Sequence, residues 1–531
     1  VSSLKACAEK KDLLTGNQLH VDIIRHGLVQ KPYLASSLIS MYAKCGIISK
    51  AQQIHDEFQA RNVVTWNAMI TGYARHGQVL EGLNCYGRME NEGIFPNHVT
   101  FICILKVCGI IGAIDKGKQI HSKVVISIKD SMEKDLVMIG SALVDMYVKC
   151  GLIAIAQKVH SDLRVRNVVT WSILIAGYVQ QGKGHEALNS YEKMRIEGLC
   201  PDAITFSYIL KACGSIGAIE KGKEVHDEVA NKGILRNDTT LGTALVDMYA
   251  KCAMLEKAQE VLRELPGRDI VPWNALISGY VTHEHGEEAL KCFEKMRAEG
   301  IAPNPSTFVF SLKAAGSIKD TQKIQEIHAD IERKGFLESD LVVGNTLVDV
   351  YAKCGLFQTA EKVFDDLPEQ DVYSWTSLIA GFVDFGYNQK ALDCFEKMQL
   401  KGIQPNAVTY VFCLKACDTM QDEQKIRGLD YEIEKQGLLE KDLVIGNTLV
   451  DLYAKGGLLL MAQNVFDKLP VRDMITWSSL IAGYAEHGLR DEALKCFEHM
   501  RLEGIPPSAV SYISALKSCS IMGTLYKGRE I

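Results

Sequence analysis

Apolar residues recur along this chain at the spacing of one face of an α-helix. One such face consists of Trp273, Leu276, Ile277 and Tyr280, at i, i+3, i+4 and i+7. The next consists of Leu290, Phe293 and Met296. Gly300 and Pro303 then follow as helix-stop signals. No alternation of period two competes with this pattern, so the chain is predicted to be all-α and built from pairs of helices.

The five tryptophans of the chain mark an internal repeat. They lie at Trp66, Trp171, Trp273, Trp375 and Trp477, so that successive tryptophans are separated by 105, 102, 102 and 102 positions. Strings such as WNALISGY and EALKCFEKMR recur with the same period. A single helical hairpin of this size cannot bury its apolar face, whereas stacked hairpins share a continuous core. The predicted fold is therefore an all-α superhelical solenoid.

Each long period divides into a 35-residue, a 36-residue and a 31-residue unit, which end, counted from Ile270, at Asn304, Asp340 and Asp371. The first period is three residues longer because of extra residues in the stretch VVISIKDSMEKD. We expect one continuous array, with both ends of the chain cutting through it. Its predicted parts are a partial repeat over 1–31, long periods over 63–167, 168–269, 270–371 and 372–473, a further 35-residue unit over 474–508, and a partial repeat over 509–531.

Composition narrows the possible partners. The 531 residues carry a formal net charge of -6, which argues against a protein that grips nucleic acid by bulk charge alone. No run approaches the roughly 18 apolar residues of a membrane span, so no membrane partner is predicted. Any nucleic-acid partner must be held by a local stripe of basic residues and by contacts to the bases.

Motifs for catalysis or metal binding are incomplete. The 16 cysteines sit in apolar helical strings, as Cys150, Cys252 and Cys354 do, and form no C-x-x-C pair, which favours free core residues in a reducing compartment. The H-x-E strings at His55 and His226 lack the P-C-x-x-C partner of a zinc deaminase, so packing histidines are expected there. No phosphate-binding G-x-x-x-x-G-K-[ST] motif occurs. Neither a metal, nor a cofactor, nor an enzyme activity is predicted for this segment.

The strings VVTWNAMI at Val63–Ile70, EALNSYEKMRIEGLCPD at Glu186–Asp202 and LVDMYAKC at Leu245–Cys252 resemble the pentatricopeptide repeat family. The triplet of unit lengths resembles its plant PLS subclass, and the similarity covers essentially the whole chain. This resemblance implies a right-handed superhelix that binds single-stranded RNA, one base per repeat, in a chloroplast or mitochondrion. It also implies a role in cytidine-to-uridine editing or RNA processing, organellar editing-factor proteins as partners, and a deaminase-like DYW domain that would follow Ile531 in a longer chain.

The resemblance assigns base recognition to the fifth and last residues of each unit. In the 35-residue units these pairs are Asn67 with Asn97, Ser172 with Asp202, Asn274 with Asn304, Thr376 with Asn406, and Ser478 with Ser508. In the 31-residue units they are Ser36 with Asn62, Ser141 with Asn167, Thr243 with Asp269, Asn345 with Asp371, and Asn447 with Asp473.

The side-chain chemistry supports this assignment. An Asp offers only acceptors and suits the ring N–H of guanine or uracil, whereas an Asn can donate to the ring nitrogen of adenine or cytosine. A short fifth side chain leaves room for a purine, and a longer amide meets a pyrimidine. The 36-residue units have Ile102, Ser207, Val309, Val411 and Ile513 at the fifth position and are expected mainly to space the RNA. The family pairing then predicts 5′-ACNAGNGCNUANUNN-3′, where N is unassigned and Ser478 with Ser508 leaves its base open.

Two further sets of residues are expected to contact RNA. The resemblance implies that second-position side chains sandwich the bases; in the 35-residue units these are Val64, Val169, Val271, Tyr373 and Ile475. A lysine recurs at the thirteenth position of every 31-residue unit, at Lys44, Lys149, Lys251, Lys353 and Lys455. Stacking of the units would align these lysines as a ladder for phosphates.

Each of these features has a structural alternative. The lysines also suit the last turn of a helix, where a cation complements the helix dipole. Ser, Thr and Asn at the fifth position also suit a helix N-cap. For the whole chain, the alternative is a helical scaffold that binds a protein or peptide in its groove, as tetratricopeptide arrays do, although those arrays repeat with a single uniform period. A third, weaker alternative is an enzyme whose active domain follows Ile531.

Overall fold

The computed structural model describes residues 1–127, 133–236, 238–265, 267 and 269–522. Throughout these ranges the regular secondary structure is helical, without a strand, which confirms the predicted all-α class. Part of the longer stretch VVISIKDSMEKD, and of the partial repeat over 509–531, lies outside the described residues. None of the described helices is both long and apolar enough to span a bilayer.

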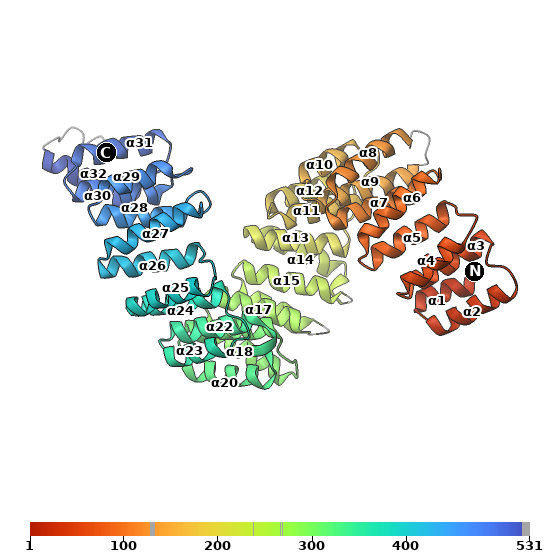
Figure 1. The fold of residues 1–531 in the computed structure, drawn as a ribbon, viewed down its shortest axis with the longest axis horizontal. Helices are drawn as coiled ribbons and strands as arrows, with labels where there is room; N and C mark the ends of the chain where they lie inside the picture. The colour runs from red at the N-terminus through yellow and green to blue at the C-terminus, as the bar shows by residue number, and fades with distance from the viewer. Residues whose placement is uncertain (128–132, 237, 266, 268, 523–531) are drawn as a thin grey trace. The chain divides into compact units, whose positions relative to one another are not determined.

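The chain divides into two compact units, Val1–Gly279 and Tyr280–Ile531. Helix α17 (Ile270–Thr282) crosses the boundary. Both units are built in the same way, from helical hairpins that follow one another in sequence order (Figure 1).

In the N-terminal unit, the first helices of the hairpins are α1 (Ser2–Lys10), α3 (Pro32–Lys44), α5 (Val63–Arg75), α7 (His98–Ile111), α9 (Glu133–Lys149), α11 (Val168–Gln180), α13 (Ala203–Ile216) and α15 (Thr239–Lys251). The second helices are α2 (Leu13–Arg25), α4 (Ile48–Glu57), α6 (Val79–Asn91), α8 (Ile114–Ser127), α10 (Ile153–Asp162), α12 (Gly184–Ile196), α14 (Ile219–Asn231) and α16 (Leu255–Glu264). A short 3-10 helix, η1 (Ile234–Arg236), precedes α15.

In the C-terminal unit, the first helices are α19 (Pro305–Ser317), α22 (Leu341–Lys353), α24 (Val372–Asp384), α26 (Ala407–Met420), α28 (Leu443–Lys455), α30 (Met474–Glu486) and α32 (Ala509–Met522). The second helices are α18 (Gly286–Ala298), α20 (Thr321–Arg333), α23 (Phe357–Asp366), α25 (Asn388–Leu400), α27 (Glu423–Lys435), α29 (Leu459–Lys468) and α31 (Arg490–Leu502). The single-turn helix α21 (Phe336–Ser339) precedes α22.

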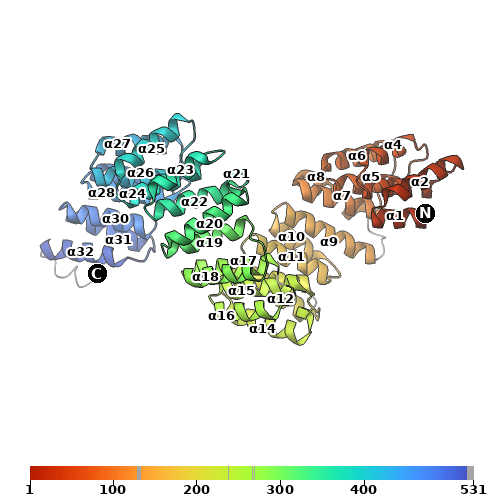
Figure 2. The ribbon, with the colours of Figure 1, turned by 90° about the horizontal axis from the view of Figure 1, so that it is seen from below.

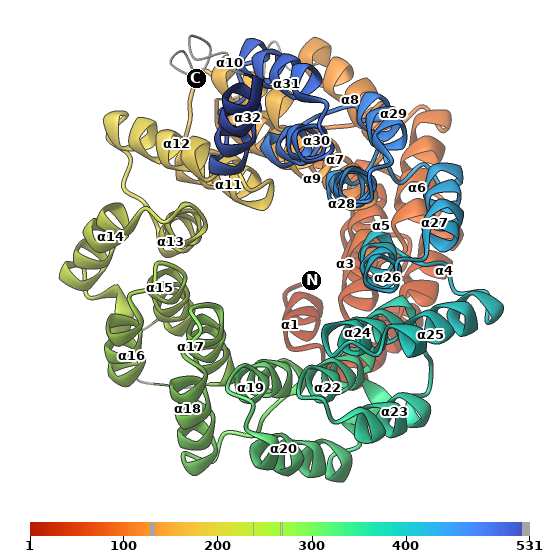
Figure 3. The ribbon, with the colours of Figure 1, turned by 90° about the vertical axis from the view of Figure 1, so that its left-hand side faces the viewer.

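Within each unit the first helices pack on one another in series. Helix α3 contacts α1 and α5, for example, and α24 contacts α22 and α26. Each second helix packs on the first helices beside it and lies on the other side of the stack, as α20, α23 and α25 do relative to α19, α22 and α24 (Figures 2 and 3). This stacking of hairpins is an α-solenoid.

The core follows the predicted apolar faces. All seven residues of the two faces identified from the sequence, from Trp273 to Met296, are buried. Small residues let the first helices approach closely: a Cβ added to Gly381 in α24 would lie 2.5 Å from the Cβ of Ala352 in α22. The predicted stop signal is also present, because Gly300 follows α18 with a left-handed φ of 80°.

Candidate nucleic-acid interface

The last residue of most units caps the first helix of the next unit. Asp371 is the N-cap of α24, and its Oδ1 accepts the backbone N–H groups of Tyr373 and Ser374, both at 2.9 Å. Such a cap satisfies N–H groups that have no partner inside the helix. The same role is held by Asn62, Asn97, Asn167, Asp202, Asn304, Asn406 and Asp473.

The fifth residues lie inside the first helices, so the alternative that they are N-caps is wrong. Asn345, for instance, lies in α22, whose N-cap is Asp340. The cap is the last residue of the preceding unit where the first helix begins at the first position of its own unit; α9, which begins at Glu133, starts four residues before that position. Capping therefore accounts for a polar residue at the unit end. It accepts Asn and Asp almost equally, however, and does not require one rather than the other.

Four of the predicted pairs are in direct contact, although the members of each pair lie in different hairpins. Asn345 Nδ2 donates to Asp371 Oδ1 and Oδ2 at 3.0 and 3.1 Å. Asn447 Nδ2 lies 3.2 Å from both carboxylate oxygens of Asp473. The other two direct pairs are Asn67 with Asn97 at 3.2 Å and Ser478 with Ser508 at 2.8 Å. The stacking of first helices thus places each fifth residue beside the following cap.

Two further pairs are joined through the third residue of the next unit. Thr376 Oγ1 lies 2.7 Å from Thr409 Oγ1, which donates to Asn406 Oδ1 at 3.0 Å. In the same way Ser172 hydrogen-bonds Thr205, which lies 2.6 Å from Asp202 Oδ1. In both cases the intervening threonine side chain is fully buried.

In three 31-residue units the fifth hydroxyl bonds a carbonyl of its own helix, as the hydroxyls of Ser172, Thr376 and Ser478 also do. Ser36 bonds Tyr33 O, Ser141 bonds Val137 O and Thr243 bonds Thr239 O. Their predicted partners are Asn62, Asn167 and Asp269, and the last of these accepts the N–H of Val271 at 3.0 Å. Asn274 and Asn304 are divided between the two units of the chain, so their pairing stays a prediction.

The last residue is the more accessible member of most pairs. The fifth residues Asn67, Ser172, Thr376, Asn447 and Ser478 are buried, whereas the last residues are half-buried or, at Asp202 and Asp269, exposed. Partial burial acts to raise the pKa of Asp473, but hydrogen bonds from Thr476, Asn447 and Ile475 outweigh it and hold that pKa below 3.8. Asp473 is therefore an ionised acceptor at neutral pH.

Apolar side chains stand in solvent next to these pairs. The predicted sandwiching residues Val64, Val169, Val271, Tyr373 and Ile475 are between 53% and 65% exposed. Each lies two residues after a unit end, where it projects from the first turn of a first helix. Exposed apolar and aromatic side chains at a regular spacing are suited to stack on planar groups.

The lysines of the predicted ladder are held by acidic partners. Lys149, Lys251, Lys353 and Lys455 each bond the Asp four residues earlier, at 2.6 to 2.8 Å. The stem of Lys149 packs against Gly109 in α7, so it extends along the neighbouring first helix. Lys44 occupies the same place at the end of α3 and has Ser40 where the others have Asp. All five lie in the last helical turn, where their positive charge also complements the helix dipole, as the alternative interpretation expected.

The histidines that matched an H-x-E string are packing residues. His55 is 2% exposed and meets the Trp66 ring edge-on, with 4.4 Å between ring centroids. Burial lowers its pKa to about 4. His226 Nδ1 instead bonds the hydroxyl of Tyr249 at 2.9 Å. Over the described ranges no three His, Cys, Asp or Glu side chains are grouped as metal ligands would be.

The cysteines are free thiols. Cys150, Cys252 and Cys354 are half-buried at the ends of first helices, and Cys108 and Cys213 are fully buried. Burial raises the pKa of Cys213 to about 12, which disfavours the reactive thiolate. Burial of these thiols is consistent with the packing role predicted for the cysteines.

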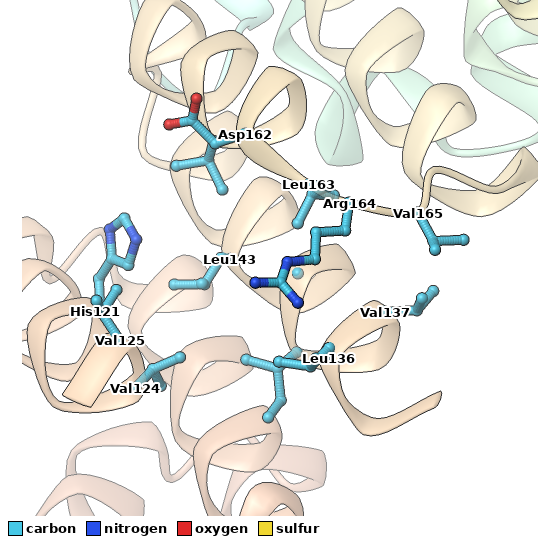
Figure 4. Close-up of a pocket in the computed structure, with 13 residues that line it drawn as sticks. His121, Val124, Val125, Leu136, Val137, Leu143, Asp162, Leu163, Arg164 and Val165 are labelled. Carbon is cyan, nitrogen blue, oxygen red and sulfur yellow. The ribbon is translucent and has the colours of Figure 1, made fainter. Parts of the chain in front are cut away.

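One cavity lies away from these residues. It measures about 570 Å³ and is formed by α8, α9, α10 and the segment after α10. Figure 4 shows His121, Leu143, Asp162 and Arg164 around it. None of the residues predicted to contact RNA lines it.

Sequence reasoning missed two groups beside the site. One is the Ser or Thr three residues after a unit end, such as Thr476, and the other is the Asp that holds each of four lysines, such as Asp349. Both groups recur with the long period in the sequence, so a comparison of the repeats could have identified them.

Comparison with known proteins agrees with this geometry. The family model described as PPR repeat family matches residues 61–109, 166–215, 268–315, 370–418 and 472–520, and the model described as PPR repeat matches 34–63, 243–270, 345–372 and 447–474. A chloroplastic pentatricopeptide repeat-containing protein of Arabidopsis thaliana is 31% identical over 92% of this chain and 78% of its own length. The chain belongs to the pentatricopeptide repeat family.

Other relatives of this pentatricopeptide repeat chain are longer. A mitochondrial pentatricopeptide repeat-containing protein of the same plant is 32% identical over 99% of the chain, which spans 57% of that relative. A chloroplastic one is 30% identical, also over 99% of the chain, which spans 64% of it. The chain thus corresponds to a little over half of these two proteins.

Solved structures share the fold. The crystal structure of the pentatricopeptide repeat protein PPR10 from maize superposes with a TM-score of 0.51 at 19% identity, over 93% of this chain and 82% of that one. PPR10 in complex with an 18-nt psaJ RNA element gives a TM-score of 0.55 at 18% identity, over 99% and 82%. At these identities the match supports the solenoid fold.

Proposed function

We propose that this chain is a sequence-specific single-stranded RNA-binding module that assigns one base to each of its 35- and 31-residue units. The observation that carries the proposal is the direct contact between the fifth and last residues of four units, with two further pairs joined through a threonine. The last residue is Asn in some units and Asp in others. Helix capping does not require this variation, whereas recognition of different bases does. An ionised Asp and a neutral Asn present opposite hydrogen-bonding edges to a base.

The neighbouring residues support the same function. Exposed second-position side chains provide stacking surfaces. The recurring lysines, four of which are paired with an Asp, provide groups that can bind phosphates. Two solved structures of PPR10, a protein of the same family, are complexes with an 18-nt RNA element. A protein or peptide scaffold would not need a choice between Asn and Asp at the unit ends.

We further propose that the array is of the PLS type and acts in a chloroplast or mitochondrion. The recurring triplet of unit lengths favours this subclass, and the relatives described above are named as mitochondrial or chloroplastic. In this proposal the array directs an RNA-editing or RNA-processing reaction, and organellar editing-factor proteins are its further partners. The chemical step would belong to a deaminase-like domain or to a separate enzyme.

Binding measurements with short RNAs test the recognition proposal. The chain is titrated with labelled 5′-ACNAGNGCNUANUNN-3′, with N fixed as adenine, and with a scrambled RNA of the same composition. We expect binding of the designed RNA to be at least about tenfold tighter, which corresponds to roughly 1.4 kcal/mol. Equal affinity for both RNAs contradicts base recognition. Absence of RNA binding together with capture of a defined peptide supports the scaffold alternative.

A further inference from the structure

A buried hydroxyl lies directly behind one of the predicted base-recognition pairs. Thr476, the third residue of its unit, is fully buried in α30. Its Oγ1 lies 2.5 Å from Asn447 Oδ1 and 2.9 Å from Asp473 Oδ1, so it can donate to either. It also accepts the backbone N–H of Asp473 at 3.1 Å. Thr476 therefore contacts both members of the pair without reaching the surface.

The corresponding hydroxyls elsewhere adopt two arrangements. In Thr65, Thr170 and Ser374 the hydroxyl donates to the main-chain carbonyl of the preceding cap, at 2.9 Å. In a second group it lies within hydrogen-bonding distance of the side-chain Oδ1 of that cap; this group is Thr100, Thr205, Thr307, Thr409 and Thr476. Three members of the second group, Thr205, Thr409 and Thr476, also contact a fifth residue.

Two pairs of identical composition differ in whether this hydroxyl contacts the fifth residue. Asn345 with Asp371 and Asn447 with Asp473 have the same two residue types. At the first pair Ser374 takes the main-chain arrangement, and the buried Oδ1 of Asn345 has no hydrogen-bond partner. At the second pair Thr476 is the donor to Asn447 Oδ1. The two pairs therefore differ in one hydrogen bond.

That bond reinforces the orientation of the amide that the neighbouring carboxylate already favours. With Thr476 as donor, Asn447 Oδ1 points to the hydroxyl and Nδ2 to the Asp473 carboxylate. A flipped amide would place Oδ1 against the ionised carboxylate and leave that pairing without its donor. The carboxylate of Asp473 is in turn held by Asn447 Nδ2 and by the backbone N–H of Thr476. Fixed donors and acceptors discriminate between ligands better than mobile ones.

We propose that Thr476 is a positioning residue for base recognition, which acts through Asn447 and Asp473 and makes this pair more selective than Asn345 with Asp371. The inference rests on the proposed function, because it concerns the same recognition pairs. It extends recognition from two residues to three, with the third belonging to the next unit. Thr409 lies in the corresponding place between Thr376 and Asn406, and Thr205 between Ser172 and Asp202, where the fifth residue has a hydroxyl in place of an amide.

The test compares base preference at two positions of one RNA. In the 15-nucleotide RNA given above, base 13 faces Asn447 with Asp473 and base 10 faces Asn345 with Asp371. Binding of RNAs with uracil or cytosine at each position gives two preference ratios for each protein. In the wild-type chain we expect a larger ratio at base 13. T476V is expected to lower that ratio about fivefold, as for one net hydrogen bond, and to leave base 10 unchanged. T476S keeps the hydroxyl and is expected to restore the ratio.

T65V is the matched control for loss of the capping hydroxyl. Thr65 accepts the backbone N–H of its cap Asn62, as Thr476 accepts that of Asp473. The Thr65 hydroxyl donates to Asn62 O, and the fifth residue of that pair, Ser36, donates within its own helix. T65V and T476V are expected to lower the melting temperature to a similar extent, whereas only T476V changes a preference ratio. The proposal is overturned if T476V keeps the ratio at base 13, or if the wild type prefers uracil at base 10 but not at base 13. A wild-type chain with no preference at either base overturns the proposed function itself.

Discussion

The side-chain amide of Asn345 donates to both carboxylate oxygens of Asp371, although the two residues lie 26 positions apart and in different helical hairpins. The contact forms because α22 and α24 pack side by side, so that the cap of one helix reaches the first turn of the other. The sequence shows that these two residues recur together in each repeat, but it does not show that they are in contact.

Replacement of Asp371 by Asn should change the base that this pair selects. A carboxylate accepts the ring N–H of uracil, whereas an amide can donate to the ring nitrogen of cytosine. We expect D371N to shift preference at base 10 from uracil toward cytosine by about tenfold or more, measured by fluorescence anisotropy. D340N is the control, because Asp340 caps α22 in the same way at the end of a 36-residue unit. If D340N and D371N change the preference equally, the pair is not the determinant.

Removal of Lys353 should weaken RNA binding without changing base preference. A phosphate contact releases about 0.7 counterion per charge on a single strand, so K353A should reduce the slope of log affinity against log salt concentration by about that amount. D349N, which frees Lys353 from its partner at 2.8 Å, should instead tighten binding at low salt. K291A is the control, because Lys291 lies on second helix α18. If K291A and K353A have the same salt dependence of binding, Lys353 does not contact a phosphate and only stabilises the end of its helix.

Acid should destabilise the N-terminal part of the chain through two histidines. Burial lowers the pKa of His55 and of His160 from 6.5 to about 4, and both rings pack edge-on against a tryptophan. Between pH 6.5 and 4 the unfolded chain binds more protons than the folded chain. The stabilisation is therefore complete above pH 6.5 and declines as the pH falls toward 4, by on the order of 2 kcal/mol per histidine.

Phenylalanine at these two positions should remove that dependence. Phe364 and Phe466 occupy the equivalent places against Trp375 and Trp477, so the ring fits. The double variant H55F/H160F should lose less stability than the wild type between pH 7 and 5 in urea unfolding followed by circular dichroism. Parallel pH profiles for the two proteins would show that other groups cause the acid sensitivity.

Close helix packing should make Gly381 intolerant of a side chain. A Cβ there would lie 2.5 Å from the Cβ of Ala352 and 3.2 Å from its backbone, so α24 would have to move away from α22. We expect G381A to destabilise the chain by about 1–3 kcal/mol, as overpacking does. G428A in α27 is the control, since its Cβ would meet open space, and should be neutral or stabilising by up to about 1 kcal/mol. Thermal unfolding of both variants measures the difference.

Much of the fold was predictable because its determinants are local and repeated. The spacing of Trp273, Leu276, Ile277 and Tyr280 identifies a buried helix face without knowledge of its neighbours. Five copies of the same pattern imply stacking, since a single hairpin cannot bury that face. The repeat also placed the fifth and last residues in register, and with them the candidates for base recognition.

Tertiary structure decided what those candidates do, because hydrogen bonds between one hairpin and the next depend on how the hairpins pack. The sequence assigned possible capping to the fifth residues, whereas the helices are capped by the last ones, such as Asp371. Asn345 and Asn447 are equivalent in sequence, yet only the second receives a hydroxyl donor from the next hairpin. The sequence thus determined which residues recur at each junction. The approach of one hairpin to the next determined which atoms are paired, which are buried and which remain accessible to a ligand.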